Sequence, residues 1–282
     1  MPDGGKDLGP RLASAGRVAV ADALIELRGV TVTTMRDSSF VVLARVDWQV
    51  ARGDFWVVAG QPHAGKSDLI LLAAGLMPPL SGRCELFGQD PQTWNEVHLD
   101  QRLRIGAVLQ SGQLFSHLTI AENVALPLRY HKNLTAAEAA DETKRLLDLM
   151  ELAPLADVTP ANVAAGWRQR AALARALILR PELLLLDNPL AGFAARHVFW
   201  WTRFLDQLWH GHGFFGGRPL TIVATTDDLR PWKNARRQFA LLHEQKFVPL
   251  GAWSGVENSP DPVVKELLSL TAEPAAAIEP ST

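Results

Sequence analysis

One eight-residue stretch has the residue types and the spacing that bind phosphate. It fits the pattern G-x-x-x-x-G-K-[ST] and consists of Gly60, Gln61, Pro62, His63, Ala64, Gly65, Lys66 and Ser67. In such a loop, backbone N–H groups and the N-terminus of the following helix surround an anion. We expect Lys66 to reach the outer phosphates and the Ser67 hydroxyl to be a magnesium ligand. Asp68, the next residue, is included among the predicted binding residues.

The segments on either side of this loop support the same interpretation. Residues 55–59 are apolar and predict a buried strand, and residues 68–75 predict a helix. A strand, a glycine-containing loop and a helix form the context that the motif needs. The alternative is a chance match in a turn that precedes an ordinary helix.

Composition narrows the class of protein. The 282 residues are 48% hydrophobic, which suits one large α/β domain or two modest lobes. A net charge of −2 gives no indication of a nucleic-acid partner attracted by bulk charge. Cys84 is the one cysteine, so no internal disulfide can form, and a reducing compartment fits. No apolar run approaches the ~20 residues of a membrane helix, and we expect no signal peptide, so any work at a membrane would go through a partner.

The rest of the chain alternates predicted strands with predicted helices. Strands are expected near residues 23–32, 40–50, 84–87, 104–109, 183–186 and 222–225. Residues 111–155 form a mostly helical insert, in which Thr135 and Glu138 make a capping box. Another helix is expected over residues 164–179. Residues 1–20 and 271–282 are expected to be disordered.

Polar residues follow two of the buried strands. Asp187 comes directly after four leucines, and Thr225 and Thr226 end the strand that begins near residue 222. In a parallel sheet, ligands bind at the carboxyl ends of the strands. We therefore expect these three residues to face the same edge as the phosphate loop.

A glycine-rich connection over residues 209–217 carries His210 and His212. Two histidines could bind a metal, but no cysteine or carboxylate accompanies them, so a flexible loop is the preferred interpretation.

The order of these motifs resembles the nucleotide-binding subunit of an ATP-binding cassette (ABC) transporter over residues 22–250. The resemblance implies an α/β P-loop NTPase fold with a RecA-like sheet lobe, an N-terminal antiparallel β subdomain, a helical subdomain over about 111–180 and a C-terminal helix over 251–270. Within that family the chain resembles the Mla-type subunits of MCE lipid-transport systems, known from toluene tolerance and organic-solvent resistance. The stretches that carry this finer resemblance are residues 109–115 (LQSGQLF), 122–128 (ENVALPL), 171–177 (AALARAL) and 258–264 (NSPDPVV).

The resemblance implies a bound MgATP and assigns residues to it. Gln110 matches the glutamine that touches magnesium and relays to the membrane subunit, and Asp187 matches the aspartate that holds magnesium, usually through water. With Ser67, these residues are the implied metal ligands. The family also implies an integral-membrane permease and a second nucleotide-binding subunit as partners, no nucleic acid, and a cytoplasmic location on the inner face of the membrane. The permease would dock around residues 111–118, where Leu114, Phe115 and Leu118 either line the groove or pack in the core.

Several positions depart from the family pattern. Asn188 stands where the family has the glutamate that polarises the attacking water, and an amide cannot accept a proton as a carboxylate can. Thr226 stands at the position of the switch histidine. The signature L-S-G-G-Q is represented by residues 163–167 (VAAGW), so alanines replace its serine and first glycine. Ala194 occupies the position of the D-loop aspartate. No aromatic for adenine stacking occurs at residues 33–35, and Phe40 is a possible substitute.

These departures together predict a subunit that binds ATP but hydrolyses it slowly or not at all, because phosphoryl transfer depends on positioning and charge stabilisation. Alternatives are a fully active transport ATPase and a non-catalytic regulatory or structural partner of another cassette subunit. A soluble ABC protein of non-transport type is disfavoured by the single cassette and the lack of heptads. Another P-loop NTPase, such as a kinase, is disfavoured by the Gln110 loop and by the helix that contains Arg168-Gln169-Arg170.

Overall fold

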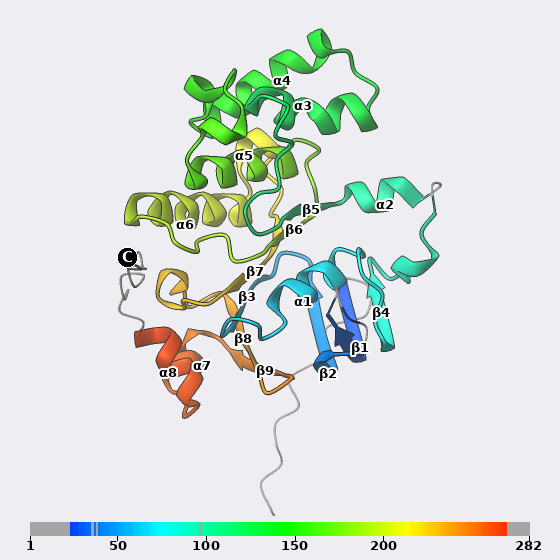
Figure 1. The fold of residues 1–282 in the computed structure, drawn as a ribbon. Helices are drawn as coiled ribbons and strands as arrows, with labels where there is room; N and C mark the ends of the chain where they lie inside the picture. The colour runs from blue at the N-terminus through cyan, green and yellow to red at the C-terminus, as the bar shows by residue number, and fades with distance from the viewer. Residues whose placement is uncertain (1–22, 35–36, 38, 96–97, 270–282) are drawn as a thin grey trace, which may run out of the picture.

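The computed structural model describes residues 23–34, 37, 39–95 and 98–269 of the chain. Two sheets and a group of helices make up this part (Figure 1). The tails predicted to be disordered, residues 1–20 and 271–282, lie outside the described residues, as does residue 35.

An antiparallel sheet of three strands in the order β2-β1-β4 forms the N-terminal part. Its strands are β1 (Ala23–Thr33), β2 (Val41–Ala51) and β4 (Ser81–Leu86). Along β1, Ile25 and Leu27 are buried while Arg28 is exposed, which is the alternation expected of a sheet with one face on the core. At a bulge between β1 and β2, the carboxylate of Asp47 accepts a hydrogen bond from the backbone N–H of Gly29 and so joins the two strands.

The larger sheet has six strands in the order β5-β6-β7-β3-β8-β9. The strands are β3 (Phe55–Gly60), β5 (Ile105–Val108), β6 (Leu183–Leu186), β7 (Thr221–Thr226), β8 (Gln238–His243) and β9 (Lys246–Gly251). All neighbours pair in parallel except β9, which is antiparallel to β8. The five parallel strands, β5, β6, β7, β3 and β8, therefore have their carboxyl ends at one common edge of the sheet.

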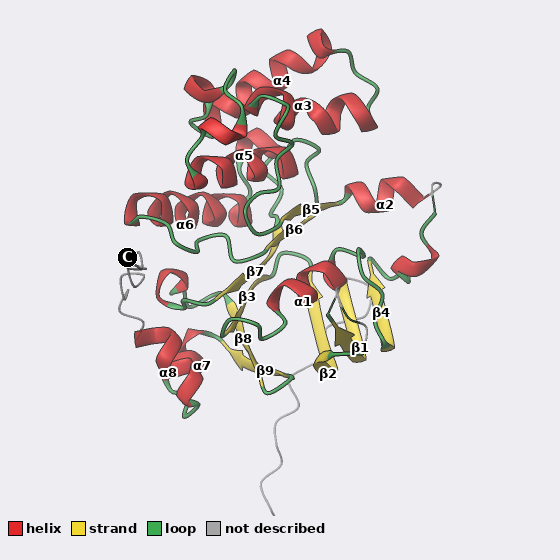
Figure 2. Cartoon of the chain, in the orientation of Figure 1, coloured by secondary structure: helices red, strands yellow, loops and turns green. Residues whose placement is uncertain are grey.

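Two helices of the predicted insert and the helix that follows the insert lie above β5 and β6 in Figure 2. They are α3 (Ile120–His131), α4 (Ala136–Leu149) and α5 (Ala165–Leu177). Thr119 and Thr135 begin α3 and α4 with complete capping boxes, in which Glu122 and Glu138 return the bond to the cap backbone. The predicted capping box at Thr135 and Glu138 is confirmed.

Five further α-helices belong to this part of the chain. They are α1 (Lys66–Ala73), α2 (Leu99–Leu103), α6 (Ala195–His210), α7 (Trp253–Glu257) and α8 (Pro262–Ser269). The single C-terminal helix expected over residues 251–270 is wrong, since Pro260 lies between two separate helices. Of the helices in the described ranges, none combines the length and the apolar character needed to cross a bilayer.

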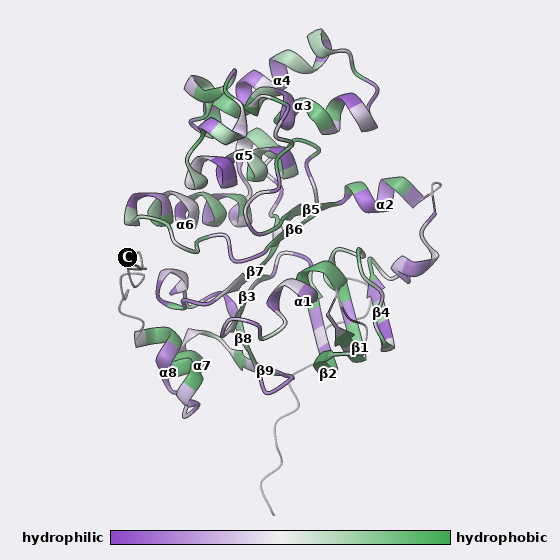
Figure 3. Cartoon of the chain, in the orientation of Figure 1, coloured by the Kyte–Doolittle hydropathy of each residue, from purple (hydrophilic) through white to green (hydrophobic). Residues whose placement is uncertain are grey.

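Strand β6 separates two hydrophobic cores. Leu184 and Leu186 pack in the core beneath α3, α4, α5 and α6, while Leu183 and Leu185 pack in the core shared by α1 and the antiparallel sheet. All four leucines are buried, as expected for a parallel strand covered on both faces, and the strand colours as uniformly hydrophobic in Figure 3. Each buried leucine contributes about 1.5–3 kcal/mol of hydrophobic stabilisation. These two cores fix the strand ends at which the polar residues lie.

Candidate functional site

The phosphate loop connects the end of β3 to the start of α1, as predicted. Gly65 is the residue before α1 and has φ 88°, a left-handed conformation that glycine adopts without strain. At Gly60 the limit is space, because a Cβ there would lie 3.1 Å from the carbonyl oxygen of Leu242 in β8. The backbone conformation at Gly65 therefore favours glycine, and the limited space beside β8 favours glycine at position 60.

Lys66 folds back over the loop that it follows. Its Nζ donates to the carbonyl oxygens of Gly60 at 2.6 Å and of Gln61 at 2.7 Å, and the side chain is 8% exposed. Burial lowers the pKa of the Lys66 ammonium, and the negative charges of Asp227 and Asp187 oppose that shift. An ammonium has three donors, so one remains for a phosphate oxygen.

Ser67 and Asp187 meet across the edge of the sheet. The Ser67 hydroxyl donates to Asp187 Oδ2 at 2.7 Å, and the Thr225 hydroxyl donates to Asp187 Oδ1 at 3.0 Å. A hydroxyl and a carboxylate are hard oxygen donors of the kind that Mg²⁺ takes, usually with one or two carboxylates and the phosphates of its ligand. The described residues hold no cluster of three or more His, Cys, Asp or Glu side chains able to bind a metal alone. Ser67 and Asp187 fit a magnesium ion that is shared with a phosphate ligand.

A cavity of about 380 Å³ opens over this group. Its lining comes from the phosphate loop, from the loop after β5, and from the ends of β6 and β7. The lining residues are Pro62, His63, Gly65, Lys66, Ser67, Asp68, Gln110, Asp187, Asn188 and Asp227. The structure thus brings Gln110, predicted as a metal ligand, into the same cavity as Ser67 and Asp187.

Asn188 is held at the cavity by two hydrogen bonds. Its backbone N–H donates to Thr225 Oγ1 at 3.0 Å, and its side-chain Nδ2 donates to Asp227 Oδ2 at 3.0 Å. The residue has φ 46°, a left-handed conformation that asparagine tolerates better than most residues. Sequence reasoning did not select Asp227, although a carboxylate directly after a predicted strand end was a signal that could have identified it.

Thr226 is not part of this cavity. The side chain is 2% exposed, and its hydroxyl donates to the backbone oxygen of Asp228 at 2.8 Å while it accepts from Trp232 Nε1 at 3.0 Å. The hydroxyl is therefore engaged by the turn that follows β7. The residue at the position of the switch histidine supplies no group to the site in this conformation.

The segment at the position of the family signature lies at the start of α5. Ala164 is the residue before the helix, and no side chain caps its N-terminus. Behind it, the Arg170 guanidinium lies over the Trp167 ring at 4.4 Å and over the Trp200 ring at 3.7 Å. None of residues 163–167 lines the phosphate cavity of this chain.

A second cavity, of about 320 Å³, adjoins the phosphate cavity and shares Pro62 and His63 with it. Phe40, 59% exposed, lies at its border, together with Val42 and residues of the β8–β9 turn. The Phe40 carbonyl accepts a hydrogen bond from the Thr34 N–H at 3.0 Å. An exposed aromatic beside the phosphate loop is suited to stacking on a nucleotide base.

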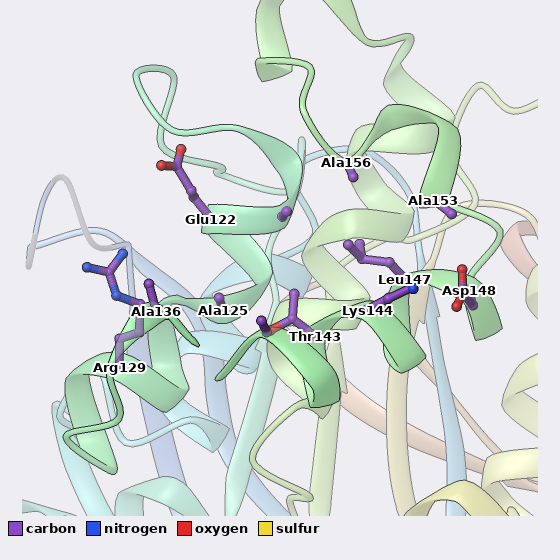
Figure 4. A pocket seen from close by; sticks show the side chains of 12 residues that line it. Glu122, Ala125, Arg129, Ala136, Thr143, Lys144, Leu147, Asp148, Ala153 and Ala156 are labelled. Carbon is purple, nitrogen blue, oxygen red and sulfur yellow. The ribbon is translucent and has the colours of Figure 1, made fainter. Parts of the chain in front are cut away.

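A third cavity, of about 440 Å³, lies in the helical region and not in the sheet (Figure 4). Alanines of α3, α4 and the segment after α4 make it apolar, and Glu122, Arg129, Lys144 and Asp148 add charge. In the loop before α3, Phe115 is 48% exposed, whereas Leu114 packs against the core. Of these two residues, Leu114 therefore packs against the core and Phe115 lies at the surface.

The two histidines of the glycine-rich connection make local contacts. His210 Nδ1 lies 2.7 Å from the backbone oxygen of Asp206, and His212 Nδ1 accepts from the N–H of Phe214 at 3.2 Å.

Comparisons with known proteins agree with this geometry. The family described as ABC transporter matches residues 43–191. The chain is 34% identical over 225 residues to a probable sulfate/thiosulfate import ATP-binding protein of Chlorella vulgaris, covering 80% of this chain and 91% of that protein. It is 31% identical over 249 residues to a methionine import ATP-binding protein of Acinetobacter baylyi, covering 87% and 68%. The dimeric ATP-binding cassette MJ0796, solved with ADP and Pi in a post-hydrolysis state, superposes with a TM-score of 0.68 at 25% identity, covering 79% of this chain and 96% of that one.

The predicted P-loop α/β fold with an antiparallel β subdomain is confirmed by these matches and by the two sheets described above. The predicted ATP-binding character has the same support. The chain belongs to the ABC transporter family, as one of its ATP-binding subunits.

Proposed function

We propose that this chain is the MgATP-binding subunit of a membrane transporter and that it hydrolyses ATP slowly. The observation that carries the proposal is the cavity in which Lys66, Ser67 and Asp187 converge while residue 188 is an amide. The groups that bind phosphate and metal are together, and the usual proton acceptor is missing.

The chain's own residues account for binding. Backbone N–H groups of the loop and the N-terminus of α1 receive the phosphates, and Lys66 exchanges its bonds to Gly60 and Gln61 for phosphate oxygens. Ser67 and Asp187 hold magnesium, with Gln110 in reach from the loop after β5. Bound magnesium neutralises charge on the phosphates. Phe40 stacks on the adenine ring.

Two partners follow from the same proposal. The first partner is a second nucleotide-binding subunit. The segment around Ala164 does not line this chain's own cavity, so it would face the nucleotide bound by that second subunit, and the corresponding segment of the second subunit would face the nucleotide bound here. An integral-membrane permease docks on the exposed Phe115 and the alanine-lined cavity of α3 and α4, which places the chain at the inner face of the cell membrane. The dimeric state of the similar cassette MJ0796 supports the first partner.

For the transported substrate, we propose a lipid of the cell envelope, on the strength of the Mla-like stretches at residues 109–115 and 122–128. The named relatives import sulfate, thiosulfate and methionine, and they support the competing assignment to a small-molecule importer. Purification of the complex with its permease, followed by extraction and mass spectrometry, decides between them. Bound phospholipid with an MCE-type partner supports the lipid assignment, and a sulfate- or methionine-binding partner contradicts it.

The test of the site compares the purified chain with Lys66→Ala, using Lys246→Ala as the matched control because Lys246 is an exposed lysine on edge strand β9. We expect MgATP binding to fall at least tenfold in Lys66→Ala and to stay unchanged in Lys246→Ala. Undiminished MgATP binding by Lys66→Ala would contradict the proposal. If the unmodified chain hydrolysed ATP as fast as an active transport ATPase, the proposed slow hydrolysis would be contradicted.

A further inference from the structure

We propose that Asp227 is the catalytic carboxylate of this site, which orients and deprotonates the attacking water, and that Asn188 is the residue that positions it. This inference rests on the proposed function and adds the group that performs the slow hydrolysis. In this assignment, a carboxylate at the end of β7 accepts the proton that the amide of Asn188 cannot accept.

Asp227 has the required location. It lines the cavity with Lys66, Ser67 and Asp187, and it is half-buried at the carboxyl end of β7, next to the end of β6. Of the two carboxylates whose charge acts on Lys66, Asp227 has the larger effect. Asp227 is thus close to the lysine that meets the outer phosphates.

Asp227 also has a free acceptor atom. Its Oδ2 accepts from Asn188 Nδ2 at 3.0 Å, and no described residue donates to its Oδ1. Asp187 differs, because Ser67 occupies Oδ2 and Thr225 occupies Oδ1. Of these two carboxylates, Asp227 is the one with an oxygen that accepts no hydrogen bond from the described residues.

Asn188 and Asp227 depend on each other. A glutamate at position 188 would bring a second negative charge beside Asp227, and like charges at this separation disfavour the ionised form of one of them. The amide instead donates to Asp227 and keeps its own oxygen as a second acceptor for the water. The bond from the Asn188 N–H to Thr225 Oγ1 fixes the backbone from which this amide projects.

The chemical step balances without a further reactant. The water oxygen forms a bond to the γ-phosphorus of ATP, and its proton passes to Asp227 Oδ1. The bond from the γ-phosphorus to the bridging oxygen breaks, and its electron pair leaves on the β-phosphate of ADP. Asp227 then releases the proton to solvent, so the products are ADP and phosphate.

The experiment uses the full chain with Asp227→Asn, which keeps the shape of the side chain and its place beside Asn188. The matched control is Asp228→Asn, since Asp228 lies outside the cavity and pairs with Arg230. Phosphate release in single-turnover mixtures is measured with Lys66→Ala as the blank. MgATP and MgADP affinities are measured alongside by calorimetry.

We expect Asp227→Asn to lower phosphate release at least tenfold, toward the blank, while Asp228→Asn releases phosphate like the unmodified chain. MgATP should bind Asp227→Asn as tightly as before or several-fold more tightly, because a charge that repels the γ-phosphate is gone, and MgADP affinity should not change.

Asn188→Ala provides the second variant, and it keeps the test decisive if Asp227→Asn fails to fold. It leaves the carboxylate in place without its donor, so we expect slower phosphate release with unchanged MgATP affinity. Unchanged release in Asp227→Asn, or release by the unmodified chain equal to the Lys66→Ala blank, would overturn the assignment of Asp227 while leaving ATP binding intact. Loss of MgATP binding in both Asp variants would also overturn it, whereas undiminished binding in Lys66→Ala would instead overturn the proposed function.

Discussion

The Ser67 hydroxyl donates a hydrogen bond of 2.7 Å to Asp187 Oδ2, across 120 positions of sequence. This bond joins the first turn of α1 to the end of β6, and it lies where a magnesium ion would be shared. If a metal binds here, Ser67 and Asp187 would hold it in place of this hydrogen bond.

The first prediction follows from this pair. Ser67→Ala removes a metal ligand but leaves the loop backbone and Lys66 in place. We expect the affinity for ATP in the presence of magnesium to fall about tenfold, equivalent to about 1.4 kcal/mol, and the affinity for metal-free ATP to be unchanged. Titration with a fluorescent ATP analogue, with and without a chelator, measures both, and Ser254→Ala in α7 serves as the control. An equal loss in both conditions would contradict the metal role.

A second prediction concerns the start of α5. Ala164 precedes α5 with φ −61° and ψ 150°, the extended geometry of a cap residue, but it offers no side-chain acceptor. Ala164→Ser should stabilise the protein by about 1 kcal/mol and raise its Tm by about 2–4 °C. Ala165→Ser, one position into the helix, should give no such gain. Differential scanning calorimetry of both variants makes the comparison, and equal melting temperatures would show that α5 is not limited by its cap.

The third prediction is a pH dependence at Glu182. This residue precedes β6 and bonds Arg104 at 2.8 Å and Arg52 at 2.7 Å. The hydrogen bond from Arg104 lowers the pKa of Glu182, burial opposes the shift, and Arg52 adds to it. Because the folded-state pKa lies below that of the unfolded chain, the contribution is present above the ordinary carboxyl pKa and is lost as the pH falls through the folded-state value.

Urea unfolding at pH 7 should therefore show Glu182→Gln to be less stable by about 1 kcal/mol, with the difference shrinking below pH 4.5. Asp141→Asn, at an exposed carboxylate on α4, provides the comparison. If Glu182→Gln lowered the stability by the same amount at pH 7 and below pH 4.5, the charge of Glu182 would not be the source of its stabilising effect.

A fourth prediction concerns a buried charge far from the site. Arg237 is 1% exposed, lies over the ring of Phe55 at 4.4 Å, and donates to Asp206 at 2.5 Å and to the backbone oxygen of Trp232 at 3.1 Å. Asp206→Ala leaves this guanidinium without its counter-charge and should cost about 3 kcal/mol of stability. The exposed pair of Lys233 and Glu257 is the contrast, and Glu257→Ala should leave the unfolding curve in place. The double variant Arg237→Met/Asp206→Leu should recover part of the loss, and a deeper loss would count against this explanation.

The sequence predicted the elements that local patterns dictate. The loop from Gly60 to Ser67 has a fixed spacing, and the leucines before Asp187 can only be a buried strand or helix segment, so both were placed correctly. Capping boxes also depend on residues three positions apart, which is why the start of α4 at Thr135 was predictable.

Side-chain direction at the strand ends could not be predicted in the same way. Thr226 and Asp227 are neighbours, yet the first turns into the interior toward Trp232 and the second lines the cavity. That choice depends on the turn after β7 and on a tryptophan six residues away, and no periodic pattern records either. The partnership of Asn188 with Asp227 was missed for the same reason, because 39 positions separate them and only the pairing of β6 with β7 brings them together.

The position of β6 between the two cores has a consequence for synthesis of the chain. The core that contains residues of β1, β2 and α1 also needs Leu183, Leu185, Val223 and Leu242 to close. On the ribosome, the first hundred residues must therefore wait with an apolar face uncovered until more than twice that length has emerged. A nascent chain in that state exposes apolar surface, and such surface favours aggregation before folding is complete.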